Sequence, residues 1–517
     1  MAACLLVVGG AYGYVRYRIN AIRTVAAPHL TPESGTVVLP GGRRVSVSTD
    51  GLAPENILLI GNETRAGLTN PNEIAQLGSP QEFSGSLSDV IMILHLDPAK
   101  DQASILSIPR DLFLPMPAGS PVGPYQKVDA ALNDGAKGAD NLIQTITDDL
   151  GIPINHYVEL EFDGFENTVN ALGGINVYFP EPLYDAESLL DIGSPGCVHL
   201  NGTEALALVR ARHLQYDPPG DGEPKADWPY DPESDLSRIT RDHTFLRILT
   251  STAESEGLTN PLQLNAFLSD ITDQITIDPG LKDQLVALAL HYHRLNSASI
   301  PEVTLPVTQV GGPAGYSYDG VNVGDVDFPD QPADDQVIAA WDHDALPAPS
   351  APAAVQVDNI TETPGLAGAT AAALHADGLT VSGIGDGNDP APTSETFVRY
   401  PPGGLPAALD VLGHLSGAVM LDPDPSLAAG HIELDVGSTL AVAAAKGGAS
   451  APSATASPPA ESNSSTTVRV PGSGAPGTGT PGVTSTTVPT TVPTPGGQTP
   501  SSATDKLQPW DPRACPS

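Results

Sequence analysis

The chain has 517 residues, including 52 glycines and 52 prolines, so it is too long for one ordinary domain and too rich in helix and strand breakers to be packed throughout. Its 23 Lys and Arg against 61 Asp and Glu give a formal net charge of -38. Such a charge repels nucleic acid, because that binding relies on basic side chains neutralising phosphates. We therefore expect no nucleic-acid partner, and two folded domains joined by linkers.

The N-terminal segment begins with the apolar run MAACLLVVGGAYGYV. This run is shorter than the roughly 20 apolar residues that span a bilayer. A cleaved signal sequence would need a basic start and a small-residue cleavage site. The alternative is a single-pass membrane anchor over residues 1–25 whose start is truncated, and we favour it, with the bulk of the chain outside the cell. Arg16, Arg18 and Arg23 would then lie on the outer side of the membrane, whereas the positive-inside rule places basic residues on the cytoplasmic side.

Residues 26–55 read as a stalk with short strands, and a larger domain follows over residues 56–310. Apolar runs typical of buried strands occupy residues 56–61, 89–97 and 103–109. Apolar residues three and four apart, followed by glycine, predict helices over residues 140–151 and 165–174. The alternation predicts an α/β fold, a three-layer α/β/α domain with a mixed central sheet.

The remainder divides by composition. Residues 311–352, rich in Pro, Ala and Asp, read as a linker, and residues 353–442 as a small βαββαβ domain. Residues 443–505 are mostly Ser, Thr, Pro, Gly and Ala, a composition that predicts disorder. Residues 506–517 read as a docking tail. In an exported protein Cys197 and Cys515 could form a disulfide, or they could be two unrelated thiols.

Basic residues are scarce, and several follow strand ends or occur in pairs. Arg65 and Arg110 follow predicted strands, where ligands of open α/β sheets bind. Arg210 and Arg212 would point to one face if ALVRAR is a strand. The full set of candidate phosphate-binding cations is Arg65, Arg110, Lys127, Arg210, Arg212, Arg238 and Arg241. Each alone could be a solvated surface charge, but clustering in so acidic a chain favours an anion site.

Carboxylates lie among these cations, at Glu63, Asp89, Asp111 and Asp235. Asp89 opens a buried strand and is the leading candidate ligand for Mg²⁺, which takes one or two carboxylates together with phosphate oxygens. Its alternative role is that of a turn residue at a strand start. Asp111 could be a base, or could orient Arg110 as an ion pair.

The ordered segments NILLIGNETR, LSDVIMILHLDP, LSIPRDLFL, KVDAALNDGA, LNGTEALALVRARH and DLSRITRDHTFL resemble the LytR-CpsA-Psr family. Residues 353–440 resemble the small LytR C-terminal domain. The resemblance implies a membrane-anchored, extracytoplasmic phosphotransferase that moves a glycopolymer from a polyprenyl-pyrophosphate carrier to the C6 hydroxyl of muramic acid in peptidoglycan. It also implies a cofactor, Mg²⁺ or Mn²⁺.

The resemblance also assigns roles to residues. It places the metal at Asp89, with Glu63 where the family usually has Asp, and the pyrophosphate at the seven cations; Asp242 stands where the family usually has Gln. The catalytic set is Asp89, Arg110, Asp111, Arg210 and Arg212, and the substrate-binding set is Arg65, Lys127, Arg238 and Arg241. Two rival functions remain, a non-catalytic polyprenyl-phosphate-binding wall scaffold and a membrane-bound transcriptional regulator. The net charge argues against the regulator.

Overall fold

A computed structural model describes most of the two predicted domains. The described residues are 17–32, 35–38, 44–47, 54–63, 87–100, 102–218, 223–232, 235–255, 272, 274–292, 300–311, 315–342, 354–361, 363–387, 394–442, 501–502 and 507–515. Arg65 lies outside them, as does most of the predicted disordered tract. The side chains of Glu63 and Asp235 also lie outside the described part, although their backbones belong to a strand and a helix.

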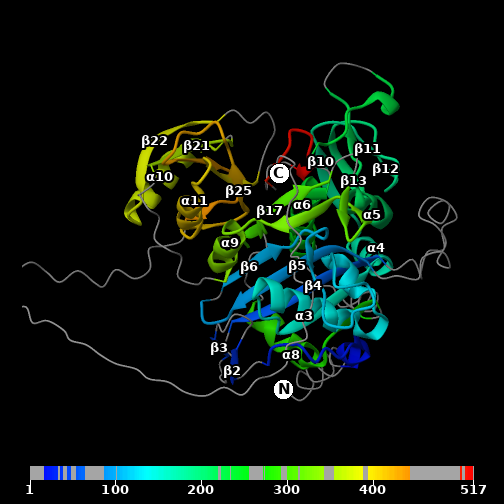
Figure 1. The fold of residues 1–517 in the computed structure, drawn as a ribbon. Helices are drawn as coiled ribbons and strands as arrows, with labels where there is room; N and C mark the ends of the chain where they lie inside the picture. Colours follow the sequence, from blue (N-terminus) through cyan, green and yellow to red (C-terminus); the bar gives the residue numbers. More distant parts are fainter. Residues whose placement is uncertain are drawn as a thin grey trace, which may run out of the picture.

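A seven-stranded mixed sheet forms the centre of the larger domain (Figure 1). Its strands, in spatial order, are β1 (Arg23–Thr24), β15 (Ile275–Ile277), β9 (His156–Glu161), β4 (Glu55–Glu63), β5 (Leu87–Asp97), β6 (Gln102–Ser107) and β16 (Glu302–Thr304). The pairs β4–β5 and β5–β6 are antiparallel, whereas β4–β9 and β6–β16 are parallel. The three predicted strands are β4, β5 and β6, and the mixed sheet is confirmed.

Helices cover both faces of this sheet, as the α/β/α prediction requires. On one face Leu58 and Ile93 belong to the same buried cluster as Ile143 of α3 (Gly138–Leu150). On the other face Ile57 packs in a separate cluster with Leu281 of α8 (Pro279–His291). Alternate residues of β4 thus face opposite layers, which explains why its sequence is a continuous apolar run. Helix α3 ends at Gly151 in the left-handed conformation, with φ 67°.

A lobe of short strands and helices extends from one end of the sheet. Its sheets contain β10 (Ile175–Phe179), β11 (Leu183–Asp185), β12 (Leu190–Ile192), β13 (Gly196–Leu200), β14 (Gln215–Tyr216) and, from the C-terminus, β29 (Arg513–Ala514). Its helices are α4 (Phe162–Ala171), α5 (Gly202–Arg210) and α6 (Asp235–Ser255). The helix predicted over residues 165–174 is α4, which starts three residues earlier.

The prediction of a linker over residues 311–352 is wrong for the part that the structure describes. Residues 315–342 form β18 (Tyr316–Tyr318), β19 (Val321–Gly324), β20 (Val326–Pro329) and α9 (Ala333–Trp341), and β20 pairs with β17 (Val307–Val310). Val326, Ile338 and Trp341 are buried. The apolar residues of this segment therefore fill the core, while its Pro and Asp residues obscured the pattern.

The small C-terminal domain has one main strand more than the predicted βαββαβ order. Its elements are β21 (Ala354–Asn359), α10 (Leu366–Ala376), β22 (Thr380–Asp386), β23 (Thr396–Tyr400), α11 (Leu405–Leu412), β24 (Leu415–Ser416), β25 (Val419–Pro423), β26 (His431–Val436) and β27 (Ala441–Val442). Strand β25 is the addition, at the edge of the five-stranded sheet β22-β21-β26-β23-β25. Its five residues pair in parallel with β23, the strand just before α11.

The N-terminal prediction holds only in part. No helix among the described residues is long and apolar enough to cross a bilayer, and residues 1–16 of the predicted anchor lie outside them. Arg23 and Thr24 belong to the central sheet as β1, and the backbone of Thr31 donates a hydrogen bond to Ile154. Residues 23–31 are thus part of the domain, whereas β2 (Gly35–Val38) and β3 (Arg44–Val47) form a hairpin in the predicted stalk.

A buried histidine ties the sheet to α8 and makes the stability of the fold depend on pH. His156 is 1% exposed, with Nδ1 3.1 Å from Asp278 Oδ2 and Nε2 3.6 Å from Glu55 Oε2. Burial acts to lower the pKa of His156, but the hydrogen bond to Asp278 and the negative charges of Asp278 and Glu55 raise it to about 9. Asp278 also caps the start of α8, where its side chain accepts a hydrogen bond from the backbone N–H of Leu281. The His156 imidazolium therefore positions the carboxylate that caps this helix.

We expect His156→Gln to remove this pH-dependent contribution. A pKa that is higher in the folded state gives stability that is complete below the ordinary value near 6.5 and lost as the pH rises through about 9. The difference in free energy of unfolding between parent and variant should therefore shrink by about 3 kcal/mol between those pH values. Urea unfolding at pH 6 and pH 9.5 measures it, with exposed His431→Gln as control. A difference that does not change with pH would contradict the assignment.

Candidate functional site

Five of the predicted site residues meet at one edge of the central sheet. Asp89 lies near the start of β5, and Arg110 and Asp111 follow β6 directly. Lys127 ends β8 (Tyr125–Lys127), which pairs with β7 (Phe113–Pro115). Arg212 lies two residues beyond α5. We call Asp89, Arg110, Asp111, Lys127 and Arg212 the charged cluster.

Direct ion pairs hold the charged cluster together. Arg110 pairs through Nη1 with Asp89 Oδ1, and its Nε is 3.8 Å from Asp111 Oδ2. Asp111 Oδ1 is 2.7 Å from Lys127 Nζ, and Oδ2 is 3.3 Å from Arg212 Nη2. Asp111 therefore gathers three cations. This confirms that it pairs with Arg110, and the cluster carries one more positive than negative charge.

Antiparallel pairing explains why distant segments meet here. The end of β6 lies beside the middle of β5, with Ser107 opposite Met92, so Arg110 continues past β6 toward the start of β5, where Asp89 lies. The end of β4 reaches the same edge, where the backbone of Glu63 is opposite Leu87, two residues before Asp89. Arg110 lies at this edge, whereas the convergence of Arg65 with Arg110 stays a prediction, because Arg65 lies outside the described residues.

Asp129 belongs to the same neighbourhood and was not singled out from the sequence. It lies in the 3₁₀ helix η3 (Val128–Leu132), and its backbone N–H donates to the Arg110 carbonyl at 3.3 Å. Burial raises the pKa of Asp129 to about 7, while the positive charge of Arg110 acts to lower it. Its position two residues after Lys127 is the one sequence feature that could have identified it.

Arg210 and Arg212 do not lie on a strand, so the interpretation of ALVRAR as one is wrong. Residues Gly202–Arg210 form α5, and Asn201 and Glu204 make a reciprocal capping box at its start. The helix ends at Ala211, which is extended with φ −66° and ψ 109°. Arg210 therefore lies at the helix C-terminus, favourable for a cation, with its guanidinium 4.8 Å from the Phe162 ring centroid. Arg212 turns toward Asp111.

The two remaining predicted cations are buried in α6. Arg238 is 1% exposed and its Nη1 is 2.9 Å from Asp242 Oδ2, one helical turn along. The charge of Asp242 is thus balanced by Arg238. Arg241 Nη1 is 3.0 Å from Asp231 Oδ2, and its Nη2 donates to the Ala211 carbonyl at 2.7 Å. Arg241 thus contacts the turn between Arg210 and Arg212, while the contact of either α6 arginine with pyrophosphate stays a prediction.

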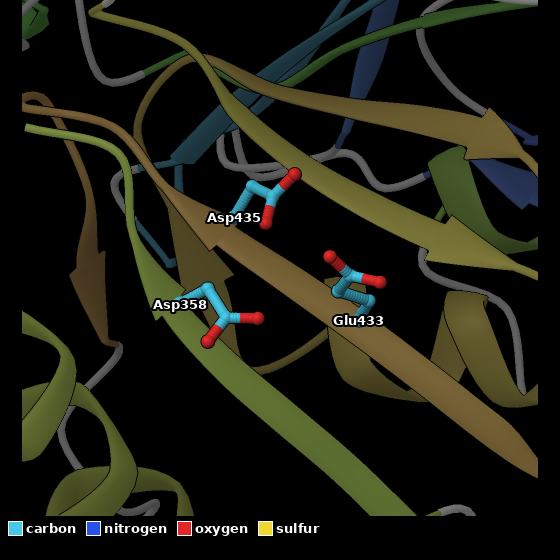
Figure 2. A group of neighbouring side chains, drawn as sticks. All are labelled: Asp358, Glu433 and Asp435. Carbon is cyan, nitrogen blue, oxygen red and sulfur yellow. The ribbon is translucent and has the colours of Figure 1, made fainter. Parts of the chain in front are cut away.

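An acidic group lies apart from this site, in the C-terminal domain. Among the described residues, Asp358, Glu433 and Asp435 bring carboxylate oxygens within 4.8 Å of one another. Figure 2 shows Asp358 on one strand and the other two on its neighbour, and these strands are β21 and β26. Burial raises the pKa of Asp435 to about 7, although Arg399, whose Nη1 is 3.1 Å from Asp435 Oδ2, acts to lower it. An arginine thus offsets part of this negative charge.

A disulfide joins Cys197 of β13 to Cys515 near the C-terminus, with the Cα atoms 5.8 Å apart. The pairing considered from the sequence is therefore confirmed. It closes a loop with a sequence separation of 318, and such cross-links stabilise mainly by restricting the unfolded chain. A persistent disulfide is typical of proteins in an oxidising compartment.

Cys515→Ser is expected to lower the free energy of unfolding by about 2–5 kcal/mol. Guanidinium unfolding of parent and variant, each with and without a reducing agent, measures this. The reducing agent should destabilise the parent and leave the variant unchanged, and Cys4→Ser should behave as the parent. Equal stability of the reduced and oxidised parent would contradict a structural role for the disulfide.

Two family profiles match the chain. The profile described as the LytR_cpsA_psr family matches residues 36–327, and the one described as "LytR cell envelope-related transcriptional attenuator" matches residues 353–443. The first covers more than half of the chain and includes residues 311–327 of the predicted linker. The second coincides with the predicted small domain.

Named relatives are similar over parts of their length. "Probable cell wall biosynthesis protein LcpB" of Corynebacterium glutamicum is 33% identical over 229 residues, 44% of this chain and 49% of that protein. "Cell wall biosynthesis protein LcpA" of the same organism is 27% identical over 319 residues, 56% of this chain and 57% of that protein. "Polyisoprenyl-teichoic acid--peptidoglycan teichoic acid transferase TagV" of Bacillus subtilis is 38% identical over 132 residues, 24% of this chain and 32% of that protein.

The chain thus spans about half the length of the two Corynebacterium relatives and a third of TagV. Among solved structures, "LytR-Csp2A-Psr enzyme from Actinomyces oris" is similar, with a TM-score of 0.42 and 22% identity over 62% of this chain and 96% of that one.

Proposed function

We propose that this chain, which belongs to the LytR-CpsA-Psr family, transfers a glycopolymer from a polyprenyl-pyrophosphate carrier to a muramic acid C6 hydroxyl of peptidoglycan, outside the cell membrane. The names of the relatives support cell wall biosynthesis and teichoic acid transfer to peptidoglycan. In this proposal the chain uses a divalent metal ion and is attached to the membrane. The disulfide supports the extracytoplasmic location.

The charged cluster is the observation that carries this proposal. Arg110, Lys127 and Arg212 converge in a chain with 23 basic residues against 61 acidic ones. Guanidinium and ammonium groups bind phosphate oxygens through charge-assisted hydrogen bonds. Asp111 holds Lys127 and Arg212 in place before a ligand binds. Their side chains therefore lose little conformational entropy when the ligand binds. Arg210, on the same turn as Arg212, would add a further cation.

The donor set at Asp89 fits a hard divalent cation. Asp89 is a carboxylate at the same strand edge as the backbone of Glu63, and Mg²⁺ or Mn²⁺ is bound by carboxylates together with phosphate oxygens. Asp89, with Glu63, would hold the ion. When bound, the ion would neutralise charge on the pyrophosphate oxygens.

In the proposed reaction the acceptor hydroxyl oxygen forms a bond to the phosphorus nearest the sugar. The bond from that phosphorus to the bridging oxygen breaks, polyprenyl phosphate leaves with the electron pair, and the hydroxyl proton passes to solvent or a base. Arg110, Lys127 and Arg212 would stabilise the charge that develops on the phosphate oxygens, as is usual in phosphoryl transfer. Asp111, which contacts these cations, would orient them.

Release of polyprenyl phosphate from a synthetic polyprenyl-pyrophosphoryl disaccharide tests this function. We expect release with Mg²⁺ and none after chelation with EDTA. Tight binding of the lipid without turnover, with or without metal, would overturn the transferase and leave the alternative of a wall scaffold that binds polyprenyl phosphate. A chain that neither binds nor turns over the donor would overturn both.

A further inference from the structure

The C-terminal segment over residues 507–515 is attached to both domains. Strand β29 pairs with β10, with Arg513 opposite Tyr178, and Cys515 is bonded to Cys197. Trp510 stacks on Tyr216, with ring centroids 3.7 Å apart and planes 6° from parallel. Leu507 packs with two buried residues of the small domain, Phe397 and Met420. In Figure 1 this segment, in red, lies between the two domains.

Asp511 is the fully buried acidic residue of this segment. It is 0% exposed, and its Oδ1 is 3.3 Å from Arg241 Nη1. Its Oδ2 accepts a hydrogen bond from the Gln508 backbone N–H at 2.8 Å, which fixes the carboxylate within the segment. Asp231, which precedes α6 in the larger domain, places its Oδ2 3.0 Å from the same Nη1. Arg241 is thus held between two buried carboxylates, one of them 270 residues away in the chain.

Arg241 connects this carboxylate pair to the phosphate-binding turn. Its Nη2 donates to the carbonyl of Ala211, the residue that ends α5 between Arg210 and Arg212. Carbonyls at a helix C-terminus have no partner within the helix and need an outside donor. Ala211 is 0% exposed, so water does not replace that donor readily. Arg241 therefore supplies the donor for a buried carbonyl of the residue that directly precedes Arg212.

We propose that Asp511 is a positioning residue of the site, and that the C-terminal segment is the element that sets the Arg210–Arg212 turn through Arg241. This inference rests on the proposed function. Two carboxylates at Nη1 fix the direction in which Nη2 points, whereas without Asp511 only Asp231 would hold Nη1 and the contact of Nη2 with Ala211 would be held less firmly. The segment then acts on pyrophosphate binding without touching the ligand.

Asp511→Asn in the full chain, studied at pH 8.5, tests the proposal. Burial raises the pKa of Asp511 to about 7, so at this pH the substitution removes the charge and keeps the size. Farnesyl pyrophosphate binding, measured by calorimetry well below the melting temperature of each protein, should weaken about tenfold, since losing part of a charge-assisted contact at the turn costs about 1.4 kcal/mol. Asp505→Asn, which removes the same charge from the same tail, should bind within about twofold of the parent. Unchanged affinity in Asp511→Asn would overturn the proposal.

A second measurement separates positioning from folding. A protease cleavage site is introduced between residues 443 and 500 of the full chain. After cleavage of the folded protein, reduction of the Cys197–Cys515 disulfide releases the tail. The proposal predicts weaker farnesyl pyrophosphate binding after release, restored by a peptide of residues 505–517 but not by the same peptide carrying Asp511→Asn. Affinity that survives release of the tail, or rescue by both peptides, would contradict it.

Amide hydrogen exchange separates failure of this proposal from failure of the function. The Ala211 N–H donates to Leu208 at 3.2 Å, and its exchange should quicken about tenfold in Asp511→Asn whether or not the chain binds the lipid. A parent that does not bind farnesyl pyrophosphate would count against the proposed function. Unchanged exchange at Ala211 would count against the role of Asp511.

Discussion

Arg212→Ala is expected to lower kcat/KM for glycopolymer transfer by about 10²–10³-fold, the usual cost of removing one donor that stabilises charge in a transition state. The fold should survive, because the side chain of Arg212 is 31% exposed and Asp111 keeps Lys127 as a partner. Steady-state kinetics at saturating Mg²⁺ measures the loss, and circular dichroism checks the fold.

Arg399→Ala is the matched control for Arg212→Ala. Arg399 is an arginine with a 35% exposed side chain and an ion pair to Asp422, both in the small domain and not in the charged cluster. It should leave kcat/KM unchanged. An Arg212→Ala variant that retains parental kcat/KM would remove Arg212 from the site.

The largest expected loss of stability comes from Arg247→Met. Arg247 of α6 is 7% exposed and pairs with Glu302 of β16 and, at 2.7 Å, with Glu395, the residue before β23. It therefore links the central sheet of the larger domain to the small domain. Removing the guanidinium leaves two buried carboxylates without the cation that balances their charge, which should lower the free energy of unfolding by about 3–5 kcal/mol.

The double variant Arg247→Met, Glu395→Gln provides the control, since it removes one of the stranded charges. It should recover part of the loss, and chemical denaturation measures both variants. If Arg247→Met unfolds at the parental denaturant concentration, Arg247 does not link the two domains energetically.

Local patterns predicted the parts of this molecule that depend on neighbouring residues. Apolar runs located β4, β5 and β6, and a terminal glycine located the end of α3. The apolar runs also placed Arg110 after one strand and Asp89 at the start of another, and in the structure these two residues pair. These features are encoded within short stretches, where side-chain periodicity and turn residues act directly.

The predictions were wrong or incomplete where contacts between distant parts of the chain determine the structure. Spacing alone suggested a strand at Arg210 and Arg212, but the capping box at Asn201 and the burial of Ala205 stabilise a helix. The pairing of Arg241 with Asp511 joins residues 270 apart, so no local pattern could reveal it. The same holds for Arg247 and Glu395, which are 148 apart.

The central claim is metal-assisted transfer to peptidoglycan at the charged cluster. The most direct test uses a polyprenyl-pyrophosphoryl disaccharide with a labelled sugar and soluble peptidoglycan fragments, and detects the new phosphodiester by phosphorus NMR. We predict transfer by the parent with Mg²⁺, none by Asp89→Ala, and parental transfer by Asp358→Ala, which alters the acidic group of the small domain instead. Transfer by Asp89→Ala equal to the parent, or transfer that does not depend on metal, would contradict the account.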